Sequence, residues 1–206
     1  MPVRIAVLLS AGGTTLQNLI DVIAAGHLDA RIVQVVSSNA DAYGLVRAAK
    51  AGIAASVVTR KEASSRDEFS RRIFDECRRA GADLVCMAGF LQLITIPQDF
   101  QLKVMNIHPS LIPAFCGKGF YGHHVHEAVL AMGVKITGCT VHFADNEYDH
   151  GPIILQRAVP VLDDDTPDSL AERVFEQEKL AYPEAIRLFA ENRLILDGRR
   201  VRVLVK

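Results

Sequence analysis

The sequence predicts an α/β protein built on a doubly wound, mostly parallel, Rossmann-like sheet, with antiparallel additions in the C-terminal half. Short runs of β-branched residues alternate with helical patterns through the first half of the chain. Glycines stand where several of these helical patterns end. Alternation of this kind is typical of βα units, whose parallel strands are covered by helices on both faces.

Each element of the first half follows from its local pattern. Val3–Leu9 is a continuous β-branched-rich run, as expected of a covered strand. Leu16 and Leu19 recur at helical spacing in the next segment, and Ser65 is a candidate N-cap for a later helix. The expected strands are Val3–Leu9, Ile32–Val36, Ala55–Val58, Asp83–Met87 and Val104–Ile107, and the expected helices are Thr14–Ala25, Ala42–Ala51 and Arg66–Ala80.

The second half has a different pattern. Lys135–Ala144 and Ile153–Val161 are strand-like runs on either side of a turn-rich loop, expected as a long hairpin or as adjacent strands. Asp168–Asn192 has the pattern of a long amphipathic helix. Leu194–Val205 resembles a closing hairpin centred on Asp197 and Gly198.

The composition bounds the size of the core and the kind of partner. The chain has 206 residues, 50% of them hydrophobic, with 23 basic and 24 acidic side chains for a formal net charge of −1. This size allows one core or two tightly merged halves. The lack of a basic excess argues against nucleic acid as a partner, although a local site can still attract a small anion.

The cysteines and the apolar runs bear on the cellular compartment. The four cysteines form no C-x-x-C pair, so free thiols are expected. No stretch reaches the ~20 apolar residues of a membrane span, and the short apolar N-terminus leads into glycines rather than a cleavage site. We therefore expect a cytoplasmic protein with no membrane partner, and the sequence leaves a homodimer open.

The segment Ser10–Thr15, between the first strand and the first helix, is a candidate anion site. Gly12 and Gly13 would let a phosphate approach the backbone N–H groups at the start of the helix. The segment matches neither the dinucleotide fingerprint nor the P-loop motif. The alternative is that Thr14 or Thr15 only caps the helix.

Asn106 and His108 form a candidate chemical pair. Two positions apart on an expected strand, they project from the same face, and Pro109 ends the strand directly after them. Ligands of open α/β sheets collect at the carboxyl ends of strands. An amide donor beside an imidazole suits a developing oxyanion, although such a pair can also be purely structural.

The loop Asp145–Pro152 carries three acidic side chains within five positions. The simple interpretation is a solvated turn. A carboxylate from this loop placed beside His108 would instead orient the imidazole and raise its pKa.

A histidine-rich segment raises the question of a metal. His123, His124, His126 and Glu127 fit neither the H-E-x-x-H motif nor a zinc finger. We therefore expect the polar start of a helix there, and no metal.

Taken in order, several segments resemble those of the phosphoribosylglycinamide formyltransferase family. The likeness extends from end to end and rests on the order and spacing of the segments. The matching segments are Leu9–Leu16, Ser37–Gly44, Met87–Phe90, Asn106–Pro113, His142–Leu155 and Gln177–Pro183. The resemblance implies a one-carbon group transferase with the formyltransferase fold, which uses 10-formyltetrahydrofolate and glycinamide ribonucleotide and no metal.

The resemblance also implies roles for individual residues. Asn106, His108 and Asp149 match the catalytic set of the family. The residues that match the ribonucleotide site are Gly13, Thr14, Thr15, Phe175, Glu176, Gln177 and Glu178. The residues that match the folate pocket are Arg66, Leu91, Gln92, Leu93, Ile94, Asn106, Asp145, Asn146, Glu147, Tyr148 and Asp149. On this basis we expect a single formyltransferase domain over residues 1–206, in which a phosphate-binding βα half (1–103) merges with a catalytic and folate-binding half (104–206).

The implied reaction belongs to de novo purine biosynthesis and needs no covalent enzyme intermediate. The amine of glycinamide ribonucleotide would attack the formyl carbon and leave a tetrahedral intermediate with a negative oxygen. Asn106 would donate to that oxygen, and a protonated His108 held by Asp149 would stabilise it. Asp149 would carry the amine proton, through water, towards the leaving folate nitrogen.

The chain departs from the family pattern at a few positions. Ala11 replaces a frequent glycine, Thr15 stands where an asparagine is common, and the loop Cys116–Gly122 is longer than usual. These differences put substrate contacts in that loop in question, and none of them touches the catalytic set.

Two alternatives are a 10-formyltetrahydrofolate hydrolase and a non-catalytic phosphosugar-binding module. The hydrolase shares the catalytic set, but it carries an added N-terminal domain and tends to have a second histidine where Pro109 stands. Methionyl-tRNA formyltransferase has a basic character and a long C-terminal extension that this chain lacks. A Rossmann oxidoreductase would need the glycine fingerprint, and a binding module has no use for the Asn-His-Asp set. We therefore expect the amine formyltransferase.

Overall fold

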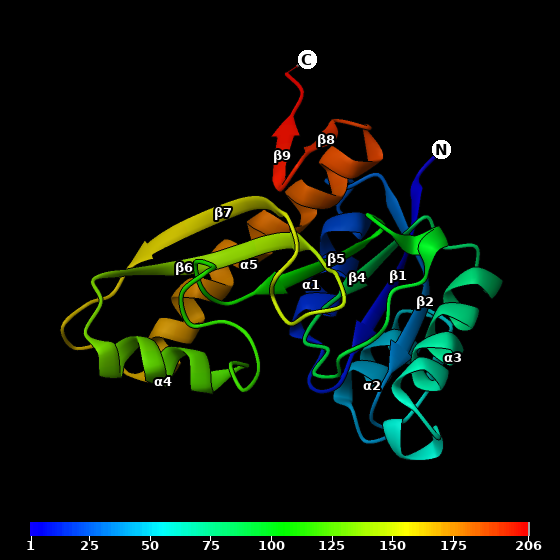
Figure 1. Ribbon diagram of the computed structural model, residues 1–206, viewed down its shortest axis with the longest axis horizontal. Coiled ribbons are helices and arrows are strands. Elements are labelled where there is room, and N and C mark those ends of the chain that lie inside the picture. The colour runs from blue at the N-terminus through cyan, green and yellow to red at the C-terminus, as the bar shows by residue number, and fades with distance from the viewer. Residues whose placement is uncertain (206) are drawn as a thin grey trace. The chain divides into compact units, whose positions relative to one another are not determined.

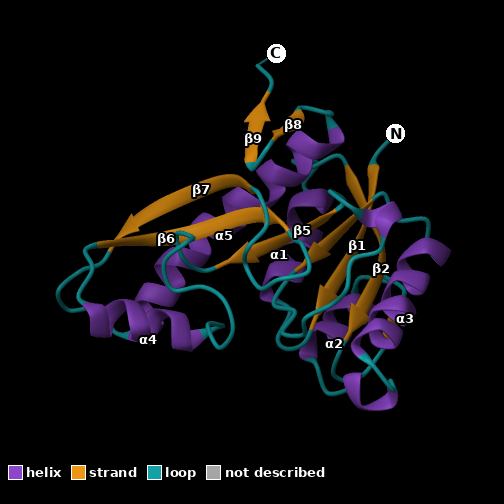
Figure 2. Ribbon diagram, viewed as in Figure 1, coloured by secondary structure: helices purple, strands orange, loops and turns teal. Residues whose placement is uncertain are grey.

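The computed structural model describes residues 1–205, which divide into two compact units, Met1–Met105 and Asn106 onwards. In the first unit strands alternate with helices, as the sequence predicts (Figures 1 and 2). Its strands are β1 (Val3–Leu9), β2 (Ala30–Ser37), β3 (Ala55–Val57), β4 (Leu84–Met87) and the start of β5 (Val104–His108). Its helices are α1 (Thr14–Ala24), α2 (Tyr43–Lys50) and α3 (Arg66–Arg79), with the short 3-10 turns η1 (Arg60–Glu62) and η2 (Gln98–Phe100).

The strands of the first unit pair in parallel around β1. Strand β1 pairs with β2 on one side and with β4 on the other, and β2 pairs with β3. The chain therefore moves outwards from β1 to β3 and then returns across β1 to β4. Because such crossovers are right-handed, α1 and α2 cover one face of these strands and α3 covers the other. In agreement, every residue from Ile5 to Leu9 is fully buried.

Local chemistry explains how α3 begins and which face it buries. The Ser65 hydroxyl accepts a hydrogen bond from the backbone N–H of Glu68 at 3.0 Å, so Ser65 is the N-cap that the sequence predicts. Phe69, Ile73 and Phe74 are fully buried on one stripe of the helix. A cap and an apolar stripe in the expected phase place the start of α3 at the predicted residue.

The second unit combines an antiparallel ribbon with a long helix. Its elements are the end of β5, α4 (His123–Met132), β6 (Ile136–Phe143), β7 (Ile153–Pro160), α5 (Pro167–Ala190), β8 (Leu194–Asp197) and β9 (Arg200–Val203). Strands β6 and β7 pair antiparallel, and α5 packs along both of them and against α4 (Figure 1). Thr166 and Ser169 form a reciprocal capping box that begins α5.

The observed strand order confirms the predicted fold class. The larger sheet has the order β3-β2-β1-β4-β5-β6-β7, and β8 pairs with β9 in a separate hairpin. The antiparallel pairs lie in the C-terminal half, as expected. Strand and helix boundaries differ from the prediction by a residue or two. The sequence anticipated a helix start at His123 and gave α4 no end, because this helix is short and follows an irregular loop.

Two further properties concern the whole described chain. No helix within residues 1–205 is long and apolar enough to cross a membrane. All four cysteines are free thiols, and Cys77, Cys86 and Cys139 are buried. Burial raises the pKa of both Cys77 and Cys139 to about 12, so these two thiols stay protonated at neutral pH.

Candidate active site

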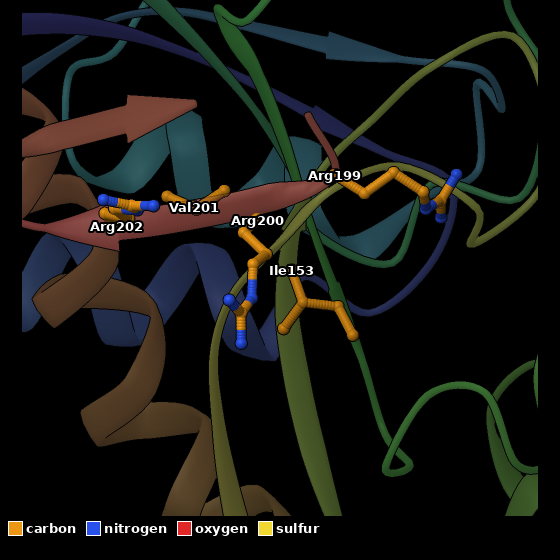
Figure 3. Close-up of a pocket in the computed structure, with 5 residues that line it drawn as sticks. All are labelled: Ile153, Arg199, Arg200, Val201 and Arg202. Carbon is orange, nitrogen blue, oxygen red and sulfur yellow. The ribbon is translucent and has the colours of Figure 1, made fainter. Parts of the chain in front are cut away.

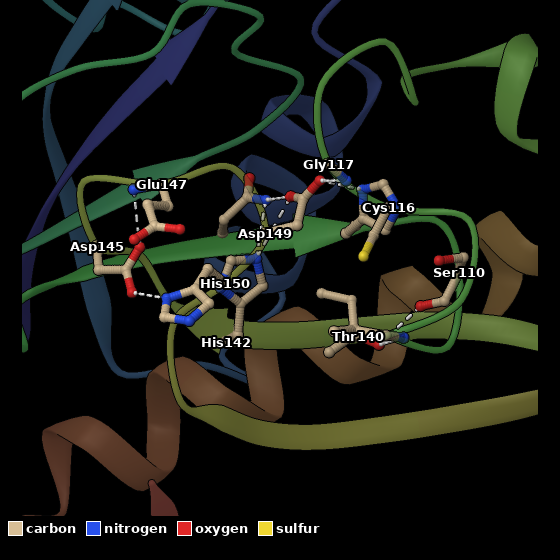
Figure 4. A network of polar contacts seen from close by, with 12 residues as sticks. Ser110, Cys116, Gly117, Thr140, His142, Asp145, Glu147, Asp149 and His150 are labelled. Atoms are coloured by element: carbon tan, nitrogen blue, oxygen red, sulfur yellow. Dashed lines mark hydrogen bonds and ion pairs between the residues drawn. The ribbon is translucent and has the colours of Figure 1, made fainter.

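The candidate chemical pair meets a carboxylate in the second unit. Asn106 and His108 lie at the end of β5. Asp149 lies in the loop between β6 and β7 (Figure 4). Asn106 Nδ2 donates to Asp149 Oδ1 at 3.3 Å, and His108 Nδ1 lies 3.5 Å from Asp149 Oδ2. The structure thus brings together the three residues that the resemblance grouped.

Asp149 is held in an unusual backbone conformation. Its φ is +52°, in the left-handed region, where a residue with a side chain is strained by about 1 kcal/mol or more. The backbone N–H of Gly117 donates to Asp149 Oδ2 at 2.8 Å, and the side chain is only 10% exposed. The contacts of the buried carboxylate offset the strain and fix its position.

A second imidazole, His142, completes the cluster. The register of β6 and β7 shifts between Val141 and His142, and such irregularities re-aim side chains. Figure 4 shows the His142 ring directed towards Asp149. His142 Nδ1 lies 2.8 Å from the carbonyl oxygen of Phe143, which only accepts, so Nδ1 carries the proton of the neutral ring.

The protonation of His142 fixes the orientation of the Asn106 amide. With its proton on Nδ1, the neutral His142 ring accepts at Nε2, and Asn106 Nδ2 lies 3.1 Å away. One amide hydrogen of Asn106 therefore points at His142 and the other at Asp149. The sequence placed His142 inside a matching segment but gave it no role, because its contacts depend on the register shift.

The hydrogen bonds of His108 fix its tautomer as well. His108 Nε2 lies 2.9 Å from the carbonyl oxygen of Phe115, so Nε2 carries the proton of the neutral ring. The lone pair on Nδ1 then faces Asp149 Oδ2. A second proton placed on Nδ1 would complete a charge-assisted hydrogen bond to the carboxylate.

Burial works against a charged His108. The side chain is 5% exposed, and this burial lowers the pKa of His108 below its ordinary value, although Asp149 and the Phe115 carbonyl act to raise it. Asp149 does act to raise the pKa of His108, as the sequence predicts for a neighbouring carboxylate. The depth at which the end of β5 is buried outweighs the charge of Asp149, so the imidazole is neutral at pH 7.

Asp149 itself is ionised. Burial alone would raise the pKa of Asp149, but the His142 and His108 imidazoles and the Gly117 N–H together lower it below its usual range. The site therefore holds one buried carboxylate beside two imidazoles.

The loop that supplies the Phe115 carbonyl and the Gly117 N–H is braced on β6. Residues 109–122 form neither helix nor strand (Figure 2). The Thr140 hydroxyl donates to the Ser110 carbonyl at 2.7 Å and accepts from the Ile112 N–H at 3.0 Å. These contacts give an irregular loop a fixed path, and they could not be read from the sequence.

The acidic side chains of the loop between β6 and β7 differ in their environments and contacts. Asp145 Oδ1 accepts from the backbone N–H of Glu147 at 2.9 Å, and Asp145 Oδ2 lies 2.7 Å from His150 Nδ1 (Figure 4). A Cβ on Gly151 would collide with the backbone of Phe143, so the loop ends where only glycine fits. Asn146, Glu147 and Tyr148 are exposed. The solvated-turn interpretation thus holds for the tip of the loop and is wrong for Asp149.

The candidate anion loop lies in the first unit. Gly13 is the N-cap of α1 with φ +69°, and no side chain caps this helix. The alternative that Thr14 or Thr15 is the cap is therefore wrong, because both lie in the first turn. A Cβ on Gly13 would come within 2.7 Å of the Gly44 Cα. Glycine at this position lets α2 approach and leaves the first N–H groups of α1 without a side-chain acceptor.

The other residues that matched the family pattern lie in several elements. In the first unit, Arg66 is exposed at the start of α3, and the segment Leu91–Ile94 follows β4, with Leu91 exposed and Ile94 buried. In the second unit, Phe175, Glu176, Gln177 and Glu178 lie on α5.

Two of the α5 acids differ sharply in environment. Glu176 is exposed and pairs with Lys179 at 2.5 Å. Glu178 is half-buried, and its burial raises the pKa of the carboxyl to about 7. It lies close enough to Cys139 for its charge to raise the pKa of that thiol.

The histidines of α4 do not converge on one point. His123 Nδ1 lies 3.4 Å from Asp168, and His124 Nδ1 lies 3.1 Å from Glu127. His126 is buried, and its Nδ1 has no hydrogen-bond partner. Across residues 1–205, no group of three or more His, Cys, Asp or Glu side chains could hold a metal ion.

Known proteins resemble this chain in sequence and in structure. Residues 3–186 match the family model described as formyl transferase. The phosphoribosylglycinamide formyltransferase of Haemophilus influenzae is 40% identical over 195 residues, which cover 94% of this chain and 90% of that protein. The crystal structure of glycinamide ribonucleotide transformylase 1 from Symbiobacterium toebii is 45% identical, with a TM-score of 0.93 over 99% of this chain and 95% of that one.

Longer proteins also match. The trifunctional purine biosynthetic protein adenosine-3 of Gallus gallus is 42% identical over 91% of this chain. The chain spans 18% of the length of that protein and 14% of the Drosophila melanogaster protein of the same name.

The raised pKa of Glu178 predicts a specific pH dependence of stability. A carboxyl whose pKa rises from 4.5 in the unfolded chain to about 7 on folding stabilises most below pH 4.5, and this stability is lost as pH rises to about 7. Relative to Glu178→Gln, the wild type should lose on the order of 2 kcal/mol of unfolding free energy across this window. Urea unfolding of both proteins at several pH values measures the difference. Glu176→Gln, at an exposed site, is the control, and a Glu178→Gln difference that is flat with pH would contradict the assignment.

Proposed function

The chain belongs to the formyl transferase family, and we propose that it transfers the formyl group of 10-formyltetrahydrofolate to the amine of glycinamide ribonucleotide in de novo purine biosynthesis. The match over residues 3–186 and the named relatives of similar length support this proposal. The observation that carries the chemistry is the buried cluster of Asn106, His108 and Asp149. In the proposed reaction a C–N bond forms between the amine and the formyl carbon, and the C–N bond to folate breaks.

Asn106 is suited to stabilise the negative oxygen of the tetrahedral intermediate. Its amide hydrogens point at His142 and Asp149, with the longer contact, 3.3 Å, to Asp149. The oxyanion can take over this weaker contact while His142 keeps the amide in its orientation. A donor that is already oriented costs no reorganisation as the charge develops.

His108 responds to the charge that develops. Before the reaction, burial keeps the ring neutral. An oxyanion close to the ring adds a second negative charge to that of Asp149, and opposite charges within ~4–6 Å favour the protonated form. Proton uptake from water at Nδ1 then completes the hydrogen bond to Asp149 Oδ2, and this proton returns to water when the intermediate collapses. The imidazole is therefore charged only when its charge stabilises the intermediate.

Asp149 is the proposed proton carrier. Its pKa lies below the usual range, so it is ionised and able to accept a proton. In this proposal the proton that the amine loses passes through water to Asp149 and on to the leaving folate nitrogen. The positive φ and the Gly117 contact hold the carboxylate in place for this step.

The two substrates are assigned to different segments. We assign the ribonucleotide phosphate to the N–H groups of Gly13, Thr14 and Thr15, because α1 begins without a side-chain cap and helix N-termini attract anions. The rest of the ribonucleotide is assigned to residues 175–178, and folate to Arg66, residues 91–94 and residues 145–149. These assignments retain the division into a phosphate-binding half (1–103) and a catalytic and folate-binding half (104–206). We also propose that the protein acts in the cytoplasm.

The proposed function predicts that folate consumption depends on the ribonucleotide. With 10-formyltetrahydrofolate alone, deformylation should be slow, and glycinamide ribonucleotide should raise it by orders of magnitude. An anchored amine gains from proximity, which can supply about 7 kcal/mol or more of barrier reduction, whereas a free water has no anchor. Folate absorbance and mass analysis of the product measure both rates. Rapid release of free formate without regard to the ribonucleotide would identify a hydrolase, and no turnover at all would favour a binding module.

Asp149→Asn should lower turnover by about 100-fold or more, the range of a positioned proton carrier. The amide keeps the size of the side chain but cannot accept the proton. Steady-state assays with both substrates saturating, alongside melting curves to check folding, measure the loss. Asp163→Asn makes the same chemical change at an acid that is 91% exposed, and it should be as active as the wild type. Near-normal turnover of a folded Asp149→Asn would remove Asp149 from the mechanism.

A further inference from the structure

Arg199 lies between β8 and β9, at the turn of the closing hairpin. Arg199, Arg200 and Arg202 line a surface pocket together with Ile153 and Val201 (Figure 3). Arg202 pairs with Asp197 of its own hairpin. The side chain of Arg199, in contrast, extends away from the hairpin (Figure 3) and reaches the loop between β6 and β7.

Arg199 makes two contacts with a single residue of that loop, His150. Its Nη2 donates to the backbone carbonyl of His150 at 2.6 Å, and its Nη1 lies 3.0 Å from His150 Nε2. His150 Nδ1 in turn lies 2.7 Å from Asp145 Oδ2, and Asp145 shapes the turn by accepting from the Glu147 N–H. Guanidinium, imidazole and carboxylate thus form one continuous chain of contacts.

The chemistry of the groups determines every hydrogen in this chain. A guanidinium only donates, so His150 Nε2 must accept and carries no hydrogen. The hydrogen of the neutral ring is then on Nδ1, where it donates to Asp145. Arg199 therefore selects the one tautomer of His150 that can also hold Asp145.

The contacts of Arg199 to His150 affect Asp149, because the two residues are adjacent in the chain. His150 directly follows Asp149, whose φ of +52° is a strained conformation for a residue with a side chain. The contacts of the Asp149 carboxylate to Asn106 and Gly117 hold the residue from the side of the active site. Arg199 holds the next residue in the chain from the side of the hairpin. A strained residue persists only where the surrounding structure over-determines its conformation.

We propose that Arg199 is a positioning residue for the proposed reaction: by fixing His150 it keeps Asp149 in the conformation in which its carboxylate meets Asn106 and His108. The inference rests on the proposed role of Asp149. Arg199 acts through His150 and its loop. Without it the loop samples other conformations, and a small displacement of a proton carrier costs catalysis more than binding.

The test compares Arg199→Leu with Arg200→Leu. Arg199→Leu removes both donors, and kcat should fall by about tenfold while the KM for glycinamide ribonucleotide stays within about twofold. Arg200→Leu removes a neighbouring arginine of the same hairpin and should leave kcat unchanged. Arg199→Lys keeps the charge and one donor, so it should restore part of the loss. Melting curves establish that each variant is folded.

The ¹⁵N shifts of the His150 ring supply a readout that a general loss of stability would not give. In the wild type they should report hydrogen on Nδ1 alone, and in Arg199→Leu a mixture of tautomers. His150→Phe added to Arg199→Leu should cause no further loss, because the two residues act in series. Equal kcat values for Arg199→Leu and Arg200→Leu, an unchanged His150 tautomer, or additive losses would each overturn the inference. The proposed function itself is tested by a different result: it is wrong if the wild type does not formylate the ribonucleotide.

Discussion

The ionised carboxylate of Asp149 is the group on which the rest of the candidate site depends. It accepts from Asn106 and from the backbone of Gly117, and it faces Nδ1 of His108. These partners come from the end of β5 and from the irregular loop that follows it, so one buried charge ties separate segments together. A buried carboxylate is stable only with such partners. Its contacts in turn hold the strained backbone at position 149.

The balance between burial and charge gives the site its proposed chemistry. His108 is buried deeply enough for its pKa to stay below the ordinary value even beside a carboxylate. In the proposed reaction, a negative oxygen changes that balance, and the same burial that disfavoured the charge then strengthens its interaction with the intermediate. In the proposed role of Arg199, its contacts to His150 also help to position the Asp149 carboxylate, because they hold the backbone next to Asp149.

Local pattern predicted much of the fold and the pairing of Asn106 with His108. The β1 run, the Ser65 cap and the two-residue spacing of Asn106 and His108 follow from strand and helix geometry alone. The cluster with Asp149 came from a family resemblance. What could not be predicted depends on three-dimensional placement. The role of His142 follows from a register shift, and the net pKa of His108 depends on burial depth, for which no local pattern gives a measure.

Asp149 is thus the electrostatic partner of a buried, neutral His108. The most direct measurement is an NMR titration of the His108 imidazole in the wild type and in Asp149→Asn. We expect a pKa below 6.5 in the wild type. We expect a still lower pKa in Asp149→Asn, because the variant keeps the burial and removes the one charge that opposes it. A wild-type pKa above 6.5, or a pKa that the substitution leaves unchanged, would contradict this pairing.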